Sequence, residues 1–271
     1  MKILIVGYGS IGKRHLKNLL KHTSFQFVVF SKQKNDQFLK KNKINVYNSI
    51  EKCLEEKPEI AFITNITSLH ITLAIKLAKH GLDLFIEKPL SNSMNGVNEL
   101  KKIIKKKKLI TQMGCNLRFH PCITKIRQLV LQNKIGKVIS IQSELGTYLP
   151  DWHPKEDYSQ GYASKKSLGG GVILTMIHDI DYLYWIFGNP HSLFSISGKF
   201  SDLKISSEDY CSGIICFKKN IFAELHLYFF QRPEFRSCKI KGKNGTIYWN
   251  SDTNQVKMFI NKKRKWENVL T

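Results

Sequence analysis

The chain has 271 residues, of which 42% are hydrophobic and 11% aromatic, with a formal net charge of +22. This composition excludes a disordered chain, and the length suggests two domains or one large one, at about 100 to 200 residues per domain. The basic residues are spread along the chain without a nucleic-acid-binding motif, so we expect no nucleic-acid partner and assign the charge to solvated faces or to a phosphate-bearing small molecule.

Strands and helices alternate strictly along the first part of the chain. Short apolar runs predict five strands, at residues 2–6, 25–31, 59–65, 82–88 and 109–115. Helical spacing predicts a helix between successive strands, with Ser49 as an N-cap, Gly81 at a helix end, and the last helix beginning near Ser93. This alternation is typical of an α/β fold with a doubly wound parallel sheet.

The pattern changes after Asn116. A helix near 121–133 precedes a long strand at 136–149, an aromatic and polar loop at 150–171 and a helix at 172–187. The remaining segments predict strands at 192–201, 209–219, 221–231, 235–250 and 255–261, with Asn244-Gly245 as a tight-turn signal between two strands. Consecutive strands after a few helices predict an α+β domain with a mainly antiparallel open sheet. We therefore expect a boundary near residue 117, between domains 1–117 and 118–271.

The first predicted strand runs directly into a glycine-rich turn that opens a helix, Gly7-Tyr8-Gly9-Ser10-Ile11-Gly12. In this context GxGxxG is the phosphate-binding fingerprint of dinucleotide-binding domains, and a plain glycine turn is the alternative. Gly7 permits the tight turn, Gly9 lets the backbone approach a pyrophosphate, and Gly12 lets helix and strand pack closely. The helix N-terminus then offers N–H groups to the phosphates.

The end of the second predicted strand bears on the choice of cofactor. An acidic residue there would favour NAD, but this chain has Ser31 followed by Lys32. A hydroxyl and a cation suit a 2′-phosphate, so the sequence favours NADP over NAD, unless Lys32 is one more surface lysine.

Five segments in order resemble the Gfo/Idh/MocA family of oxidoreductases. They are GYGSIGKRH, ITNITSLHITLAIKLAKHG with Thr64 and His70, EKPLS, GCNLRFHP, and GGGVILTMIHDIDYLYWIFG. The resemblance implies a Rossmann domain followed by a substrate domain, and hydride transfer between NAD(P) and a carbinol or carbonyl carbon of a sugar, sugar nucleotide or polyol. It also implies cofactor contacts from Thr64 and His70, and a homodimer or homotetramer formed through the second sheet.

The EKPLS segment places a lysine at the end of a buried strand. In the family this lysine is catalytic and lies near the nicotinamide and the reacting hydroxyl, which assigns the role to Lys88. Ligands bind at the carboxyl ends of strands in doubly wound sheets, and partial burial lowers the pKa of a lysine, which suits it to proton exchange. Glu87 is expected to contact the cofactor ribose or position Lys88, and Pro89, often cis in the family, to fix the backbone. A lysine that merely extends from a strand end to solvent is the alternative.

His178 and Asp181 lie three residues apart on one predicted helix, and so on one face. In the family the histidine meets the substrate hydroxyl as acid, base or hydrogen-bond partner, and the aspartate orients substrate or histidine. A core histidine bonded to a carboxylate is the alternative. Many relatives carry an aspartate four residues before this histidine, where this chain has Leu174, so their mechanism does not transfer in detail. Asn116 and Arg118 are expected to line the substrate cleft.

The loop at 148–171 resembles that of family members from bacterial surface-polysaccharide and nonulosonate-sugar pathways. Trp152 and Tyr162 are expected to stack on a sugar face, with packing or an oligomer contact as the alternative. The residues expected to bond sugar hydroxyls or a phosphate are Asp151, His153 and Lys165.

The remaining features bear on the redox environment and the cellular location of the protein. Six scattered cysteines without CxxC pairing indicate free thiols in a reducing cytosol, and no Cys/His cluster has the spacing of a metal site. The first strand is too short for a signal peptide, and the apolar stretch 172–187 contains aspartates, so we expect a cytoplasmic protein without a membrane partner. The main rival to an enzyme is a non-catalytic NAD(P)-sensing regulator of the same family. The sequence ends at WENVLT and does not predict the topology of the last element of the second domain.

Overall fold

The computed structural model describes residues 1–33 and 36–270. They form two compact units, one of residues 1–114 with 167–169 and one of residues 115–166 with those from 170 onward. The domain bounds 1–117 and 118–271 stay a prediction about which parts fold independently, and Thr271 lies outside the described residues. No described helix is long and apolar enough to cross a lipid bilayer.

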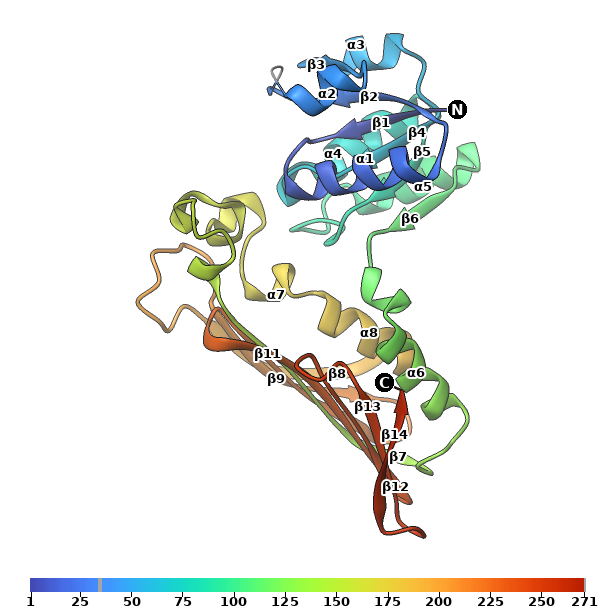
Figure 1. Ribbon diagram of the computed structural model, residues 1–271, viewed down its shortest axis with the longest axis vertical. Coiled ribbons are helices and arrows are strands. Elements are labelled where there is room, and N and C mark those ends of the chain that lie inside the picture. The colour runs from blue at the N-terminus through green and yellow to red at the C-terminus, as the bar shows by residue number, and fades with distance from the viewer. Residues whose placement is uncertain (34–35, 271) are drawn as a thin grey trace. The chain divides into compact units, whose positions relative to one another are not determined.

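The first unit is built on six parallel strands in the order β3-β2-β1-β4-β5-β6 (Figure 1). The strands are β1 (Lys2–Val6), β2 (Gln26–Phe30), β3 (Asn45–Tyr47), β4 (Ile60–Ile63), β5 (Asp83–Ile86) and β6 (Thr111–Met113). The helices are α1 (Ser10–His22), α2 (Gln37–Lys41), α3 (Ile50–Glu55), α4 (His70–Lys79) and α5 (Val97–Lys107). In β1, Ile3 and Ile5 pack with α1 and α2, whereas Leu4 and Val6 pack with α3, α4 and α5. The predicted doubly wound sheet is confirmed.

Three elements of the first unit differ from the sequence prediction. The sequence does not predict β3 and α2, because β3 is a three-residue, partly polar edge strand and α2 has only five residues. The start of α5 near Ser93 is wrong, since α5 begins at Val97. Gly96 adopts a left-handed φ of +79°, and the hydroxyls of Ser91 and Ser93 accept backbone N–H groups two residues on, so this segment forms turns.

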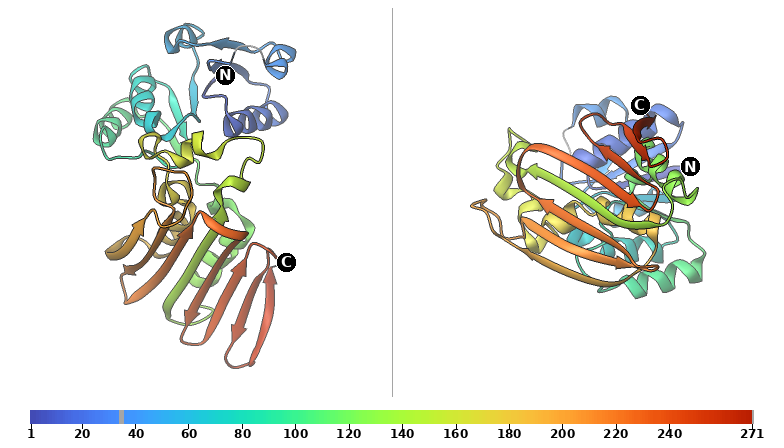
Figure 2. Two further views of the ribbon diagram at one scale, coloured as in Figure 1. Left: turned by 90° about the vertical axis from the view of Figure 1, so that its left-hand side faces the viewer. Right: turned by 90° about the horizontal axis from the view of Figure 1, so that it is seen from below.

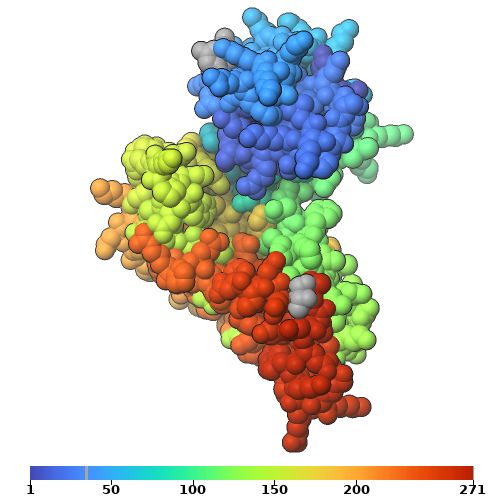
Figure 3. Space-filling model, in the orientation of Figure 1, coloured from blue at the N-terminus to red at the C-terminus, as the bar shows by residue number. Residues whose placement is uncertain are grey.

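The second unit is built on eight strands in the order β14-β13-β12-β11-β7-β10-β9-β8. The strands are β7 (Val138–Tyr148), β8 (Pro190–Gly198), β9 (Tyr210–Phe217), β10 (Ile221–Tyr228), β11 (Phe230–Gly242), β12 (Gly245–Asn250), β13 (Val256–Ile260) and β14 (Lys265–Leu270). Only β7 and β10 pair in parallel, so the predicted mainly antiparallel sheet is confirmed. The strands β12 to β14 form one end of this unit, in red in Figure 3.

Three helices cover one face of this sheet. They are α6 (Pro121–Leu131), α7 (Val172–Thr175) and α8 (His178–Phe187). Their apolar residues join those of the strands in one core. In the right-hand view of Figure 2 the strands lie in front of these helices, and no helix among the described residues of this unit covers the opposite face of the sheet.

The helix predicted over 172–187 is interrupted. Met176 leaves helical dihedral angles, with φ of −98° and ψ of 22°, and the N–H of Asp179 donates to the Met176 carbonyl in the i→i−3 pattern of a tighter turn. The ladder then restarts, so His178 stands in the first turn of α8. The sequence does not predict β14 either, because this polar strand pairs only with β13 at the sheet edge.

Candidate active site

In the glycine-rich turn between β1 and α1, neighbouring atoms crowd Gly7 and Gly12, whereas the space at Gly9 is open. Gly7 has a φ of +97°, and a Cβ there would lie 2.7 Å from the backbone of the loop after β4. A Cβ on Gly12 would lie 2.1 Å from the Gly7 carbonyl oxygen. Gly9, in contrast, has an ordinary φ of −79°, and apart from its chain neighbours no heavy atom of the described residues lies within 4 Å of its Cβ position. The turn therefore leaves room at Gly9, beside the first N–H groups of α1 at Ser10 and Ile11.

Thr64 and His70 support this turn from within the protein. The Thr64 hydroxyl, in a side chain that is 4% exposed, lies 2.8 Å from the Gly7 carbonyl oxygen. His70 is 1% exposed, with Nδ1 2.9 Å from the Pro89 carbonyl and Nε2 3.0 Å from the Asn65 carbonyl. Both side chains position loops around the turn, and the cofactor contacts expected of them stay a prediction. Sequence reasoning missed Asn65, whose buried Oδ1 has no hydrogen-bond partner among the described residues.

An ion pair joins α1 to the end of β5. Nε2 of His15 lies 2.6 Å from Oε1 of Glu87, and the backbone N–H of Lys88 donates to Oε2 at 3.1 Å. Burial alone would raise the pKa of Glu87, but His15 and this N–H outweigh it and hold the pKa below its ordinary value. Sequence reasoning missed His15, because 72 positions separate the two residues and only the folded sheet brings them together.

Lys88 is the second residue after β5, at the edge of the sheet where β1 also ends in its glycine-rich turn. Its side chain is half-buried, and its peptide bond to Pro89 is cis, as the family resemblance implies. The N–H of Glu87 donates to the Ile63 carbonyl of β4 at 2.9 Å. The segment that carries Lys88 is therefore anchored to the sheet just before the lysine.

The end of β2 carries the residues predicted to select the cofactor. Ser31 is half-buried, its hydroxyl accepts a backbone N–H two residues on, and Lys32 is exposed. Sequence reasoning missed Asp36, whose carboxylate caps α2 and lies 3.2 Å from Nζ of Lys13. The Tyr8 hydroxyl lies 3.4 Å from the same carboxylate, and burial together with Asp36 raises the pKa of Tyr8 to about 12. The Tyr8 side chain is thus committed to the fold, which leaves its backbone for a ligand.

In the second unit, two residues predicted to bind substrate pair with each other. Arg118 lies in the short helix that begins at the exposed Asn116, and its Nε and Nη2 donate to the two carboxylate oxygens of Asp181 at 2.8 and 2.6 Å. Asp181 raises the pKa of Arg118. The guanidinium groups of Arg118 and Arg127 lie 6.0 and 4.5 Å from the Trp185 ring centroid. Two cations and a carboxylate thus gather on one side of α8.

His178 is half-buried at the start of α8. The next residue, Asp179, is fully buried, and its carboxylate lies 3.3 Å from Nη2 of Arg236 on β11. One turn on, the hydroxyl of the fully buried Tyr182 lies 2.6 Å from Oγ of Ser143 on β7. These two polar contacts hold α8 against the sheet and fix the turn that carries His178. The sequence pattern singles out neither Arg236 nor Ser143.

The predicted loop residues have different environments. Nε1 of Trp152 donates to Oγ1 of Thr147 at 2.5 Å, and its ring meets Phe229 edge-on at 5.6 Å, which favours the packing alternative for Trp152. Tyr162 is 39% exposed, and Lys165 is half-buried with Nζ 2.8 Å from an amide oxygen of its own loop. The other two polar residues singled out in this loop are the exposed Asp151 and His153.

Comparison with known families accounts for most of the chain. The family described as "Oxidoreductase family, NAD-binding Rossmann fold" matches residues 1–115, and the one described as "GFO/IDH/MocA C-terminal domain" matches residues 123–248.

Two curated relatives illustrate the likeness in sequence. The chain is 28% identical over 194 residues to myo-inositol 2-dehydrogenase of Thermotoga maritima, covering 69% of this chain and 55% of the relative. It is 26% identical over 204 residues to scyllo-inositol 2-dehydrogenase (NAD(+)) of Bacillus subtilis, covering 73% and 56%. The match thus spans little more than half of the length of these relatives.

A solved structure illustrates the likeness in fold. The WlbA dehydrogenase from Bordetella pertussis, in complex with NADH and UDP-GlcNAcA, superposes with a TM-score of 0.85 at 16% identity, covering 100% of this chain and 84% of that one. At this identity the likeness concerns the fold alone.

Proposed function

The chain belongs to the GFO/IDH/MocA family of oxidoreductases, and on this premise we propose that it is an NAD(P)-dependent dehydrogenase or reductase. The reacting carbon is a CH–OH or carbonyl carbon of a sugar, sugar nucleotide or polyol. The observation that carries the proposal is the glycine-rich turn at the carboxyl end of β1, closed at Gly7 and Gly12 and open at Gly9. The inositol dehydrogenases among the relatives support the substrate class.

The residues around this turn fit a dinucleotide. The space beside Gly9 and the first N–H groups of α1 suit a pyrophosphate. NADP is favoured over NAD because Lys32 is exposed beside Ser31, and because the Asp36 carboxylate is already engaged by α2 and by a lysine. The bound cofactor would supply the hydride chemistry at the nicotinamide ring.

Lys88 and His178 are the proposed proton-handling residues. The half-buried amine of Lys88 exchanges a proton with the reacting hydroxyl, and Glu87 positions it through the backbone N–H of Lys88. His178 is the second acid or base, held by the turn that Asp179 anchors. Asp181 accepts two hydrogen bonds from Arg118, so the proposed substrate contact is made by this pair together.

Further substrate contacts are proposed for exposed or half-buried polar residues of the second unit. They are Asn116, Tyr162 and Lys165. Trp152 would support them from the core side through its contact with Phe229.

Lys88→Ala tests the proposal. We expect this variant to bind NADPH and NADH as the wild type does, in a fluorescence titration, and to lose turnover of any substrate found in a polyol and keto-sugar panel. The matched control is Lys79→Ala, which removes an exposed lysine of the same unit. Near-normal kcat in Lys88→Ala would show that the assignment of Lys88 is wrong.

The same titration separates the rival functions. Binding of neither cofactor would remove the dinucleotide site from consideration. A cofactor that binds and is never oxidised or reduced by the panel would favour the regulatory alternative.

We also infer a cytoplasmic homodimer or homotetramer that pairs through the uncovered face of the second sheet. The support is a set of apolar side chains on these strands that are at least 45% exposed. They are Phe194, Ile196, Ile214 and Phe222, which the strand register places on the face opposite the core residues Ile215 and Ala223. Light scattering behind size-exclusion chromatography measures the mass, and a monomer would contradict the inference.

A further inference from the structure

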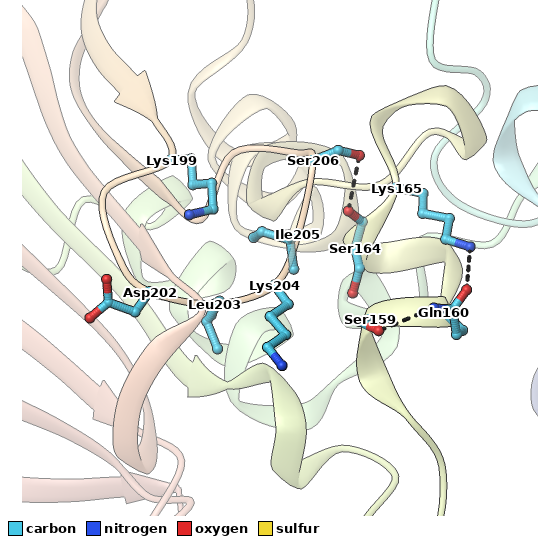
Figure 4. A pocket seen from close by; sticks show the side chains of 10 residues that line it. All are labelled: Ser159, Gln160, Ser164, Lys165, Lys199, Asp202, Leu203, Lys204, Ile205 and Ser206. Atoms are coloured by element: carbon cyan, nitrogen blue, oxygen red, sulfur yellow. Dashed lines mark hydrogen bonds between the residues drawn. The ribbon is translucent and has the colours of Figure 1, made fainter.

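A hollow of about 570 Å³ lies wholly within the second unit, between two loops. One loop covers residues 158–166 and the other residues 199–207, and they face each other across the hollow in Figure 4. The side chains that line it are Ser159, Gln160, Ser164, Lys165, Lys199, Asp202, Leu203, Lys204, Ile205 and Ser206. This volume lies within the range of small-molecule pockets, about 300 to 1,000 Å³.

Hydrogen bonds between the two loops hold the walls of the hollow in place. The N–H of Lys204 donates to the Tyr158 hydroxyl at 3.0 Å, and the N–H of Ser206 donates to the Ser164 carbonyl at 2.8 Å. The hydroxyl of Ser207 donates to the Ala163 carbonyl at 3.0 Å. These contacts join the loops at several points, so the hollow exists before any ligand enters.

The second loop is also fixed at its base. The carboxylate of Asp209, which is fully buried, accepts hydrogen bonds from the N–H of Phe200 and from the N–H and hydroxyl of Ser201, at 2.6 to 3.1 Å. A buried carboxylate with three donors is a strong anchor, because each bond is charge-assisted. The loop that carries Lys199 and Lys204 is therefore rigid on both sides.

The ionisable groups of the hollow are mainly cationic. Lys165, Lys199 and Lys204 line it together with one acidic residue, Asp202. Serine hydroxyls and an amide add neutral hydrogen-bonding groups, while Leu203 gives it an apolar side. Lysine ammonium groups and hydroxyls suit phosphate oxygens, and an apolar wall suits the organic group attached to them.

A second hollow borders this site on the side of α7. Its volume is about 390 Å³, and it shares Lys199 and Ser206 with the first. It is also lined by Leu174 of α7, in the segment that leads to His178 at the start of α8.

We propose that the hollow between residues 158–166 and 199–207 binds a phosphate group of an organic phosphate substrate. The inference rests on the proposed function for the rest of the substrate, because the second hollow extends to Ile173 and Leu174 of α7, the short helix that precedes His178. A phosphate site here narrows the substrate class to phosphorylated sugars and sugar nucleotides, in preference to neutral polyols.

Hydrogen–deuterium exchange of the full chain, titrated with inorganic pyrophosphate, tests this site. We expect slower exchange in peptides from 158–166 and 199–207, and an apparent affinity at least about tenfold weaker in Lys199→Ala/Lys204→Ala. The double variant Lys134→Ala/Lys137→Ala removes the same charge from exposed positions of the same unit and is expected to behave as the wild type. Lys199→Gln/Lys204→Gln repeats the test with longer side chains, and unchanged exchange elsewhere in the chain shows that each variant is folded.

Exchange in peptides from residues 7–17 reports on the glycine-rich turn. It therefore distinguishes the proposed dinucleotide site from the proposed phosphate site. Protection of 7–17 alone by pyrophosphate would overturn the phosphate site and leave the cofactor site standing. Protection of the two loops without any protection of 7–17 by NADH or NADPH would support the phosphate site and remove the dinucleotide function. Equal weakening in the pocket and control variants would show a general effect of charge and overturn the site.

Discussion

Alanine substitutions at Gly9 and Gly12 separate cofactor binding from folding. Gly9 has a φ of −79° and open space at its Cβ position, so Gly9→Ala introduces no strain or clash in the folded chain. Alanine restricts the unfolded chain, which stabilises the protein by about 0.4–1 kcal/mol, but Gly9 is the N-cap of α1 and alanine is a poorer N-cap residue than glycine. The two effects oppose each other, so the unfolding midpoint should change little. The added methyl group nevertheless occupies the space where the backbone is expected to meet a pyrophosphate. We expect it to weaken NADPH and NADH binding by about 10- to 100-fold, the equivalent of an overpacking cost of about 1–3 kcal/mol.

Gly12→Ala acts on the fold itself. Its Cβ would lie 2.1 Å from the Gly7 carbonyl oxygen and 2.8 Å from Oγ1 of Thr64, so the turn or the start of α1 has to shift. Overpacking of this kind costs about 1–3 kcal/mol of the free energy of unfolding. We expect Gly12→Ala to lose both stability and cofactor affinity.

Urea unfolding and fluorescence titration of both variants measure these effects. The decisive result is the contrast between the two variants. Gly9→Ala is expected to keep its unfolding midpoint and lose cofactor affinity, whereas Gly12→Ala is expected to lose both. A folded Gly9→Ala that binds both cofactors like the wild type would show that the open side of this turn is not the pyrophosphate site.

Two further predictions concern the ion pairs. Because the pKa of Glu87 is lowered, its carboxylate stabilises the fold above the ordinary carboxyl pKa of 4.5, and the contribution is lost as the pH falls through the lower folded value. The gap in unfolding free energy between wild type and Glu87→Gln should therefore shrink as the pH falls from about 7 to about 3 in urea titrations, and a gap that grows would contradict this sign. A double-mutant cycle of Arg118→Ala and Asp181→Ala should give a coupling of about 1 kcal/mol, modest because the Arg118 side chain is 33% exposed, and additive effects would refute it.

The sequence predicts the elements whose hydrophobic pattern is self-contained. β1, β4 and β5 are buried apolar runs, and the long helices show a clear apolar face, so their existence follows from local pattern. The short edge strands β3 and β14 are partly polar, and the break at Met176 depends on hydrogen bonding that composition does not reveal.

The candidate site follows the same division. The glycine-rich turn and Lys88 lie in contiguous motifs, which the sequence displays directly. His15 and Arg236 act on distant carboxylates, Glu87 and Asp179, and only the folded chain joins them. Nothing in the spacing along the sequence distinguishes these two residues from the many other basic residues of the chain.

The position of β7 has a consequence for how the chain is made. β7 is the first strand of the second sheet to leave the ribosome, yet it lies between β10 and β11 in the sheet. Both of these partners follow α7, α8, β8 and β9 in sequence. Pairing between strands that are far apart in sequence is slow. The entropy cost of closing the long intervening loop comes before the stabilising contacts that offset it. Until β10 is synthesised, both edges of β7 stay bare, and bare edges attract other chains. Nascent chains that pause before β10 are therefore the species most exposed to misassembly, and the yield of folded protein depends on how quickly the last third of the chain is translated.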